Sequence, residues 1–270
     1  MILNDIILQK RKELEEFKQR MPLQRLQRIV EKAERPKPRS FRHAIMSPRH
    51  LNIIAELKKA SPSEGVLRED FQPLRIATLY EYAGACAISI LTESHFFKGR
   101  PSYLKTVRQV TSLPLLRKDF IFERYQLYET AILEADAFLL IASILSEDEL
   151  MDLITLGREL RMDALVEVHS DAELKKAVNA GATIIGINNR NLKTLEVDPD
   201  RAKQLIPHVP KNISIVIESG LSTHDELLTY KSIGANAFLI GSTLMKSKDI
   251  AGTLQKLLGK KESSIAEEPT

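Results

Sequence analysis

The sequence predicts a single (β/α)8 TIM barrel of the α/β class, preceded by an N-terminal helical extension. From Leu51 onward, short apolar runs alternate with amphipathic stretches, and eight such pairs follow one another over roughly 200 residues. Continuous apolar strands that alternate with helices are typical of a parallel sheet covered on its outside. Eight units of this length fit a closed barrel. The alternative is an open doubly wound sheet, but GxGxxG and GxxxxGK[ST] motifs are absent from the sequence.

The composition is that of an ordinary globular protein. Of the 270 residues, 43% are hydrophobic and 28% are charged, and the net charge is only +3. Lys and Arg are scattered, so we expect no nucleic-acid partner, whereas a small anionic substrate fits this charge. The single cysteine, Cys86, excludes a disulfide framework and a cysteine metal site. No run of 18 apolar residues and no signal peptide occur, so we expect a cytoplasmic protein without a membrane partner.

The first 48 residues are expected to form helices packed on the barrel. Ile7, Leu14, Phe17 and Met21 recur at helical spacing. A cap on the main domain is the favoured interpretation, with its end in contact with ligand, and a lid over a site is the alternative. Residues 49–259 would form the barrel, and the polar segment 260–270 is expected to be disordered.

The expected strands share continuous apolar character and a length of four to six residues. They are Ile53–Leu57, Cys86–Leu91, Leu113–Arg117, Ala137–Ile141, Ala164–Val168, Thr183–Ile187, Ile213–Ile217 and Ala237–Ile240. Several of the stretches between them begin on Ser, Thr or Asp with an acid soon after, which is an N-cap signal. Several end on glycine, at Gly84, Gly181 and Gly234, as helix C-termini do.

Ionisable residues recur where these strands end. Glu56 and Lys58, two residues apart, would point the same way before the turn SPSEG. Because a barrel gathers its chemistry at the C-terminal ends of its strands, such groups would converge on one mouth. There they could perturb one another, as acid–base catalysis requires, although any single one could be a solvated rim charge. The other ionisable residues are Lys118, Glu167, Arg190 and Glu218, with the amide of Asn188 beside them.

Two further signals suggest a ligand. Glycine beside serine ends the last two strands, in Ser219-Gly220 and Gly241-Ser242, and Ser61 follows the first. These loops often bind phosphate in barrels, although plain turn chemistry would also use Gly and Ser. Phe97, Phe120 and Leu195 lie in neighbouring loops, where they either pack under the loops or receive an aromatic ring.

Seven segments together resemble the indole-3-glycerol-phosphate synthase family. They are AELKKASPSEG, LTESHFFKG, LLRKDF, LVEVH, IGINNRNLKTLEVD, ESG and AFLIGSTLM, in this order between residues 50 and 250. The resemblance implies a carboxy-lyase of tryptophan biosynthesis that closes the ring of 1-(2-carboxyphenylamino)-1-deoxyribulose 5-phosphate with loss of CO2 and water. It implies no cofactor and no metal. Arg100 departs from the family pattern, which usually has Ser there.

The resemblance also implies roles for individual residues. Lys118 would be the general acid of ring closure, Glu167 and Glu56 would carry later proton transfers in an order left open, and Lys58 would meet anionic groups. Asn188 would hold Glu167 and the substrate. The expected substrate contacts are Arg190, Glu218, Phe97, Phe120, Leu139 and Leu195, and the expected phosphate contacts are Ser61, Ser219, Gly220, Gly241 and Ser242.

Two other functions stay open at this stage. One is a Schiff-base aldolase with Lys118 or Lys58 as nucleophile. The other is a phosphometabolite-binding protein without catalysis, because a fold alone never proves chemistry. Burial and a neighbouring cation would lower the pKa of Lys118 and carboxylates would raise it, and the sequence does not set the balance. We expect a monomer, and we expect His95 and His169 to be bystanders near the mouth.

Overall fold

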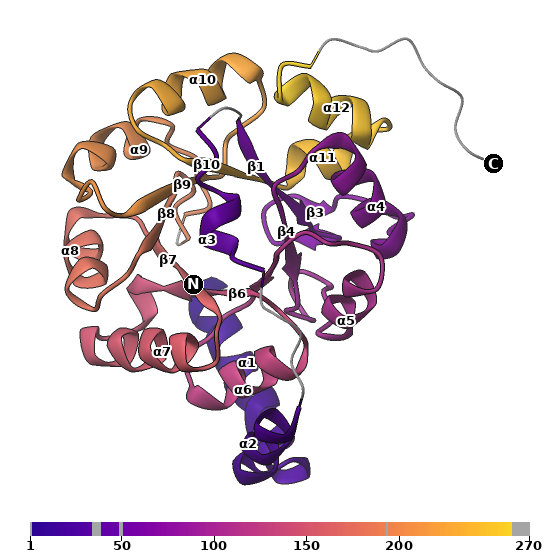
Figure 1. The fold of residues 1–270 in the computed structure, drawn as a ribbon, viewed down its shortest axis with the longest axis vertical. Coiled ribbons are helices and arrows are strands. Elements are labelled where there is room, and N and C mark those ends of the chain that lie inside the picture. Colours follow the sequence, from indigo (N-terminus) through magenta and orange to yellow (C-terminus); the bar gives the residue numbers. More distant parts are fainter. Residues whose placement is uncertain (1, 34–38, 49–50, 193, 261–270) are drawn as a thin grey trace.

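The structure is a computed structural model, and it describes residues 2–33, 39–48, 51–192 and 194–260. Eight parallel strands close into a barrel in the order β1-β10-β9-β8-β7-β6-β5-β4, with helices around the outside (Figure 1). The predicted (β/α)8 barrel is therefore confirmed. The barrel strands are β1 (Asn52–Leu57), β4 (Ala87–Leu91), β5 (Leu115–Lys118), β6 (Ala137–Ile141), β7 (Asp163–Val168), β8 (Ile184–Asn188), β9 (Ser214–Glu218) and β10 (Ala237–Ile240).

Helices follow each barrel strand and cover its outer face. They are α4 (Pro73–Ala83), α5 (Ser102–Arg108), α6 (Arg124–Ile132), α7 (Glu147–Glu159), α8 (Asp171–Asn179), α9 (Asp200–Leu205), α10 (His224–Ser232), α11 (Ser242–Lys246) and α12 (Ile250–Leu257), with 3-10 turns η1 (Ala142–Ile144) and η2 (Ile206–His208). The N-cap signals are real, since Ser146 accepts a hydrogen bond from the Glu149 N–H at 3.2 Å. Gly84, Gly181 and Gly234 all have positive φ, as helix C-termini often require.

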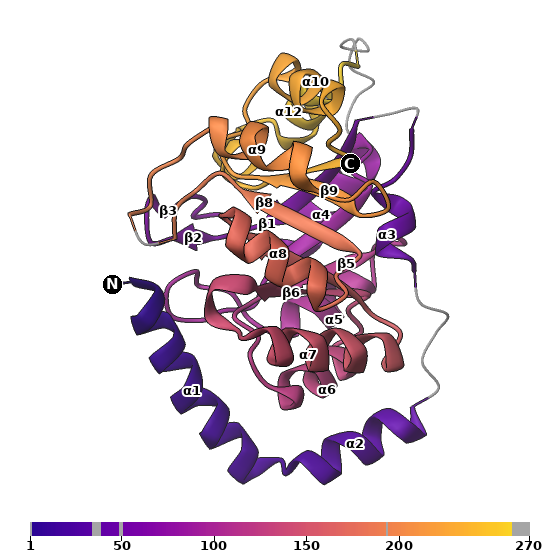
Figure 2. The ribbon, with the colours of Figure 1, turned by 90° about the vertical axis from the view of Figure 1, so that its left-hand side faces the viewer.

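Three helices precede the barrel: α1 (Ile2–Arg20), α2 (Leu23–Lys32) and α3 (Phe41–Ala44). Figure 2 shows α1 beside the β2–β3 hairpin on one side of the barrel and α3 on the other. Phe41 and Ile45 are fully buried against the apolar barrel interior, so α3 closes the N-terminal end of the strands. Leu3 and Ile6 of α1 belong to the same interior cluster at the opposite end. Of the expected tail, only Lys260 is among the described residues.

Two details of the predicted elements were wrong. Several strands begin one or two residues later than expected, and Cys86 and Leu113 precede β4 and β5. The turn SPSEG forms a hairpin in which β2 (Ala60–Ser61) pairs antiparallel with β3 (Gly65–Val66). Strands of two residues are too short to show a periodic pattern, which explains why this hairpin was not foreseen.

A buried contact between α7 and β6 provides a test of the packing. A Cβ atom added at Gly157 would lie 2.5 Å from ring carbons of Phe138, whose side chain is fully buried. Alanine is favoured over glycine in a helix by about 0.5–1 kcal/mol, but overpacking a core costs about 1–3 kcal/mol. We expect Gly157→Ala to lower the free energy of unfolding by about 1 kcal/mol or more in urea titrations. Thr155→Ala, at an exposed position of the same helix, should not lower it; equal effects would contradict this packing.

Candidate active site

A cavity of about 410 Å³ opens at the C-terminal end of the barrel strands. All sixteen residues that sequence analysis assigned to a site line it, so the structure brings them together. Ile2, Leu3 and Ile6 of α1 also line it, and the helix therefore forms one wall. The cavity has an ionic floor, an apolar side and a side rich in Ser and Gly.

Lys118, at the end of β5, lies between buried carboxylates. Its Nζ is 3.1 Å from Oε2 of Glu218 and 3.6 Å from Oε2 of Glu167. The neighbouring pair, Lys58 Nζ and Glu56 Oε2, is also 3.1 Å apart. Because the parallel strands present these residues at one level of the barrel, two lysines and three carboxylates share one small volume.

These neighbours decide the protonation of the floor. Burial by itself would lower the pKa of Lys118, but Glu218, Glu167 and Glu56 raise it above its ordinary value. Burial raises the pKa of Glu218 to about 7, against the opposing effect of Lys118. The pKa of Glu56 is lowered, because Lys58 and Lys118 outweigh its burial. Near neutral pH the site thus holds a charged ammonium group, an ionised Glu56 and a Glu218 poised to gain or lose a proton.

Two glycines make room for these carboxylates. A Cβ atom at Gly186 in β8 would overlap Oε1 of Glu218. A Cβ atom at Gly241, after β10, would overlap Oε2 of Glu56. The glycine beside Ser242 therefore has a steric role besides any contact with phosphate.

The loop after β8 is ordered by its own polar residues. The Asn188 side-chain oxygen accepts a hydrogen bond from the Arg190 N–H at 2.9 Å. Arg190 Nη1 donates to the Leu195 carbonyl at 2.7 Å, and Leu195 has a positive φ of 66°. These contacts hold the Arg190 and Leu195 side chains at the cavity rim.

The apolar side is formed by Phe97, Phe120, Leu139 and Leu195 together with α1. The rings of Phe97 and Phe120 lie 6.1 Å apart at 40°. The carboxylate of Glu93 accepts backbone N–H bonds from residues 95, 96 and 97 at 2.8–2.9 Å, which fixes the loop that carries Phe97. A flat apolar ligand fits between such walls.

The side rich in Ser and Gly already holds a carboxylate. Glu64, in the turn between β2 and β3, accepts hydrogen bonds at 2.5 Å from Ser242 Oγ and from Lys246 Nζ. Ser61, Ser219 and Gly220 line the same cavity. Sequence analysis missed both Glu64 and Lys246, although Lys246 ends the short helix that follows Gly241-Ser242. Groups that hold a carboxylate here can hold another anion.

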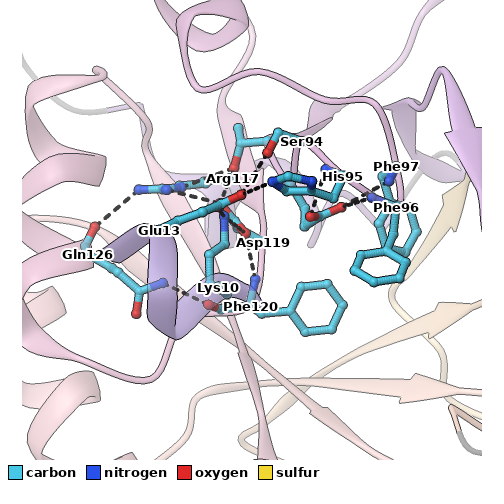
Figure 3. A network of polar contacts seen from close by, with 12 residues as sticks. Lys10, Glu13, Ser94, His95, Phe96, Phe97, Arg117, Asp119, Phe120 and Gln126 are labelled. Carbon is cyan, nitrogen blue, oxygen red and sulfur yellow. Dashed lines mark hydrogen bonds and ion pairs between the residues drawn. The ribbon is translucent and has the colours of Figure 1, made fainter. Parts of the chain in front are cut away.

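A buried network joins α1 to the strand that carries Lys118 (Figure 3). Side chains alternate along a strand, so Arg117 and Asp119 lie on the opposite face from Lys118, and Asp119 still borders the cavity. Lys10 Nζ lies 2.9 Å from Oδ1 of Asp119, and Arg117 Nη2 lies 3.0 Å from Oδ2. Thr92 donates to Asp119 at 2.6 Å. Burial by itself would raise the pKa of Asp119, but Lys10 and Arg117 lower it to about 2.

Three further observations concern metal ligands, the single cysteine and membrane-spanning helices. Within the ranges that the structure describes, no three His, Cys, Asp or Glu side chains group as metal ligands would. Burial raises the pKa of Cys86 to about 12, so this thiol stays protonated. In the same ranges no helix is long and apolar enough to cross a membrane.

Comparisons with known proteins agree with this geometry. The model of the family Indole-3-glycerol phosphate synthase matches residues 3–257. The chain is 46% identical over 260 residues to an indole-3-glycerol phosphate synthase of Campylobacter jejuni, covering 96% of this chain and all of the relative. It is 44% identical to the synthase of Thermoanaerobacter pseudethanolicus, covering 92% of this chain and 94% of the relative.

Solved structures support the fold. 3-Hexulose-6-phosphate synthase from Salmonella typhimurium matches with a TM-score of 0.62 at 14% identity, over 77% of this chain and 97% of that one. A chain of the tryptophan synthase complex from Pyrococcus furiosus matches with a TM-score of 0.58 at 16% identity, over 77% and 98%. At these identities the likeness concerns the barrel alone.

The Lys10–Asp119 pair predicts a pH-dependent stability. The pKa of Asp119 is lower in the folded protein than in the unfolded chain. Asp119 therefore contributes stability that is present above about pH 4 and is lost as the pH falls toward 2. Lys10→Met leaves Arg117 as the remaining cation, and we expect a loss of about 2–3 kcal/mol in the free energy of unfolding at pH 7. The difference from wild type should shrink between pH 4 and 2. Lys12→Met, exposed on the same helix, is the control. Equal free energies of unfolding in Lys10→Met and Lys12→Met would contradict a stabilising role of the Lys10–Asp119 pair.

Proposed function

The chain belongs to the indole-3-glycerol phosphate synthase family, and we propose that it closes the ring of 1-(2-carboxyphenylamino)-1-deoxyribulose 5-phosphate to give indole-3-glycerol phosphate, CO2 and water in tryptophan biosynthesis. The observation that carries the proposal is the position of Lys118. Its ammonium group lies among Glu167, Glu218 and Glu56, between an apolar wall and an anion-holding corner. The two ends of this substrate, a carboxyphenyl ring and a phosphate, have the chemistry of those two sides.

Binding would bend the substrate over the ionic floor. The ring would enter between Phe97, Phe120, Leu139 and Leu195, and its carboxylate would meet Lys58. The phosphate would replace the Glu64 carboxylate at Ser242 and Lys246, beside Ser61 and Ser219-Gly220. Holding the two reacting carbons together in this way supports catalysis by positioning, for which about 7–11 kcal/mol is the upper range.

Lys118 would act as the general acid of ring closure. Its raised pKa keeps the amine protonated, so it can donate to the carbonyl oxygen as negative charge develops there. The same charge disfavours a Schiff-base aldolase, because imine formation needs a neutral amine. The carboxyl groups of Glu167, Glu56 and Glu218 would carry the later proton transfers, with Asn188 and Arg190 holding the rim, and the assignment of each step stays open.

Several sequence expectations belong to this proposal. The protein would act as a cytoplasmic monomer on a small phosphorylated substrate, without a nucleic-acid partner, a metal or an organic cofactor. A mouth that carries its own acids and bases supports the last of these, since each proposed step is a proton transfer, the formation of the ring bond or a bond cleavage, and none needs a redox change.

Lys118→Ala tests the proposal. The wild-type protein should produce indole fluorescence when the aminodeoxyribulose phosphate is added, and we expect Lys118→Ala to lower kcat by at least about 100-fold while the substrate still binds. Lys105→Ala, exposed on α5, is the matched control and should keep wild-type turnover. Near-normal turnover by Lys118→Ala would refute the assignment. A borohydride-trapped adduct would instead favour the aldolase, and binding without product would favour a non-catalytic protein.

A further inference from the structure

Behind Glu167, on the side away from Lys118, the structure contains a chain of three titratable side chains. Nε2 of His169 lies 3.4 Å from Oε1 of Glu167, and Nδ1 lies 3.3 Å from Oε2 of Glu173. The backbone N–H of His169 also donates to Oε2 of Glu173 at 2.7 Å. Glu167 and His169 follow each other on one face of the β7 strand end, and Glu173 lies in the first turn of α8.

Two polar atoms face each other at the centre of this chain without a hydrogen bond. Oε1 of Glu167 and Nε2 of His169 are both buried, and neither has a hydrogen-bond partner among the described residues. The other oxygen of Glu167, Oε2, faces Lys118 at 3.6 Å. Buried polar atoms are rarely left without a hydrogen-bond partner. The facing Oε1 of Glu167 and Nε2 of His169 therefore suggest a position where a proton is exchanged.

The ring has a defined orientation for such an exchange. Glu173 is held by the backbone of His169, and its carboxylate accepts a hydrogen bond from Nδ1–H, which leaves Nε2 directed at Glu167. The His169 side chain is 13% exposed, whereas that of Glu167 is only 2% exposed. The imidazole therefore lies between the closed floor of the cavity and solvent.

The proposed reaction needs a proton from outside. When an ionised carboxylate leaves as CO2 and a hydroxyl leaves as water, the balance of atoms and charge consumes one proton in each turnover. A substrate that fills the cavity displaces the water that could supply it. We propose, on the basis of the function proposed above, that His169 is a positioning and proton-relay residue. It passes a proton from Nε2 to Oε1 of Glu167, becomes neutral, and is reprotonated from solvent.

The charges around the ring favour its protonated form, which is the form that can donate a proton. They come from Glu167 on β7, Glu173 and Lys176 on α8, Glu218 on β9, and Lys118 on β5, which faces the far oxygen of Glu167. Burial would lower the pKa of His169, but the hydrogen bond to Glu173 and the charges of Glu167, Glu173 and Glu218 raise it above its ordinary value. The imidazolium that the relay requires is thereby favoured, and it is lost as the pH rises through that pKa.

Three substitutions test the relay in the full-length enzyme. We expect His169→Asn to lower kcat by about 10- to 100-fold, at or below the lower end of what a direct general acid contributes, with a smaller effect on KM. In the wild-type enzyme kcat should fall at alkaline pH as His169 loses its proton. This fall should be smaller in His169→Asn. Added imidazole should restore turnover to His169→Ala in proportion to its concentration, which a purely structural role would not allow. Glu173→Gln should lower kcat less than His169→Asn does.

His208→Asn is the matched control. His208 also pairs with a carboxylate, Asp171 at 2.6 Å, but His208 is exposed, and Asp171, unlike Glu167, does not line the cavity. It should keep the wild-type rate and pH profile. Unchanged kcat and pH profile in His169→Asn, or no response of His169→Ala to imidazole, would overturn the relay. If wild-type protein makes no indole product, the proposed function itself fails, so the two failures are distinguishable.

Discussion

The buried charge of Lys118 is the constraint on which the rest of this structure depends. An ammonium group in a barrel mouth is costly unless carboxylates surround it, and Glu218, Glu167 and Glu56 do so. The carboxylates of Glu218 and Glu56 in turn need space. Gly186 on β8 makes room for Glu218, and Gly241 after β10 makes room for Glu56. Lys118 consequently stays charged while Glu218 is able to hold a proton near neutral pH, so the same ion cluster that stabilises the floor supplies its acid–base capacity.

The strand that carries Lys118 also connects the floor to the N-terminal helix. Arg117 and Asp119 point outward on either side of it, and Asp119 binds Lys10 of α1. About one and two turns earlier, Ile6 and Leu3 of the same helix line the cavity. The helix thus forms a wall of the cavity and is anchored next to the central lysine. A substitution at Lys10 or Asp119 would therefore affect both the apolar wall and the ionic floor of the cavity.

Local sequence patterns predicted most of the fold. They did not predict contacts between side chains that lie far apart in the sequence. The apolar runs and the capping residues predicted the barrel, and their order along the chain was enough to bring the charged strand ends into one cavity. The Lys10–Asp119 pair joins residues 109 positions apart, and no periodicity marks such a pair. Glu64 was hidden because a carboxylate in a turn is ordinary until the fold places it beside Ser242 and Lys246. The sequence indicates only that His169 lies near the mouth, because the approach of its Nε2 to Glu167 exists only in the three-dimensional structure.

The shared charge of the floor can be measured directly by 13C NMR of protein labelled at the glutamate carboxyl carbons. The account predicts one resonance that titrates near pH 7 and disappears in Glu218→Gln. Both results would follow from a carboxyl group buried beside Lys118 and two other glutamates. If every glutamate titrates near its ordinary value of about 4.3, or if the resonance near pH 7 survives in Glu218→Gln, the proposed charge balance at Lys118 is wrong.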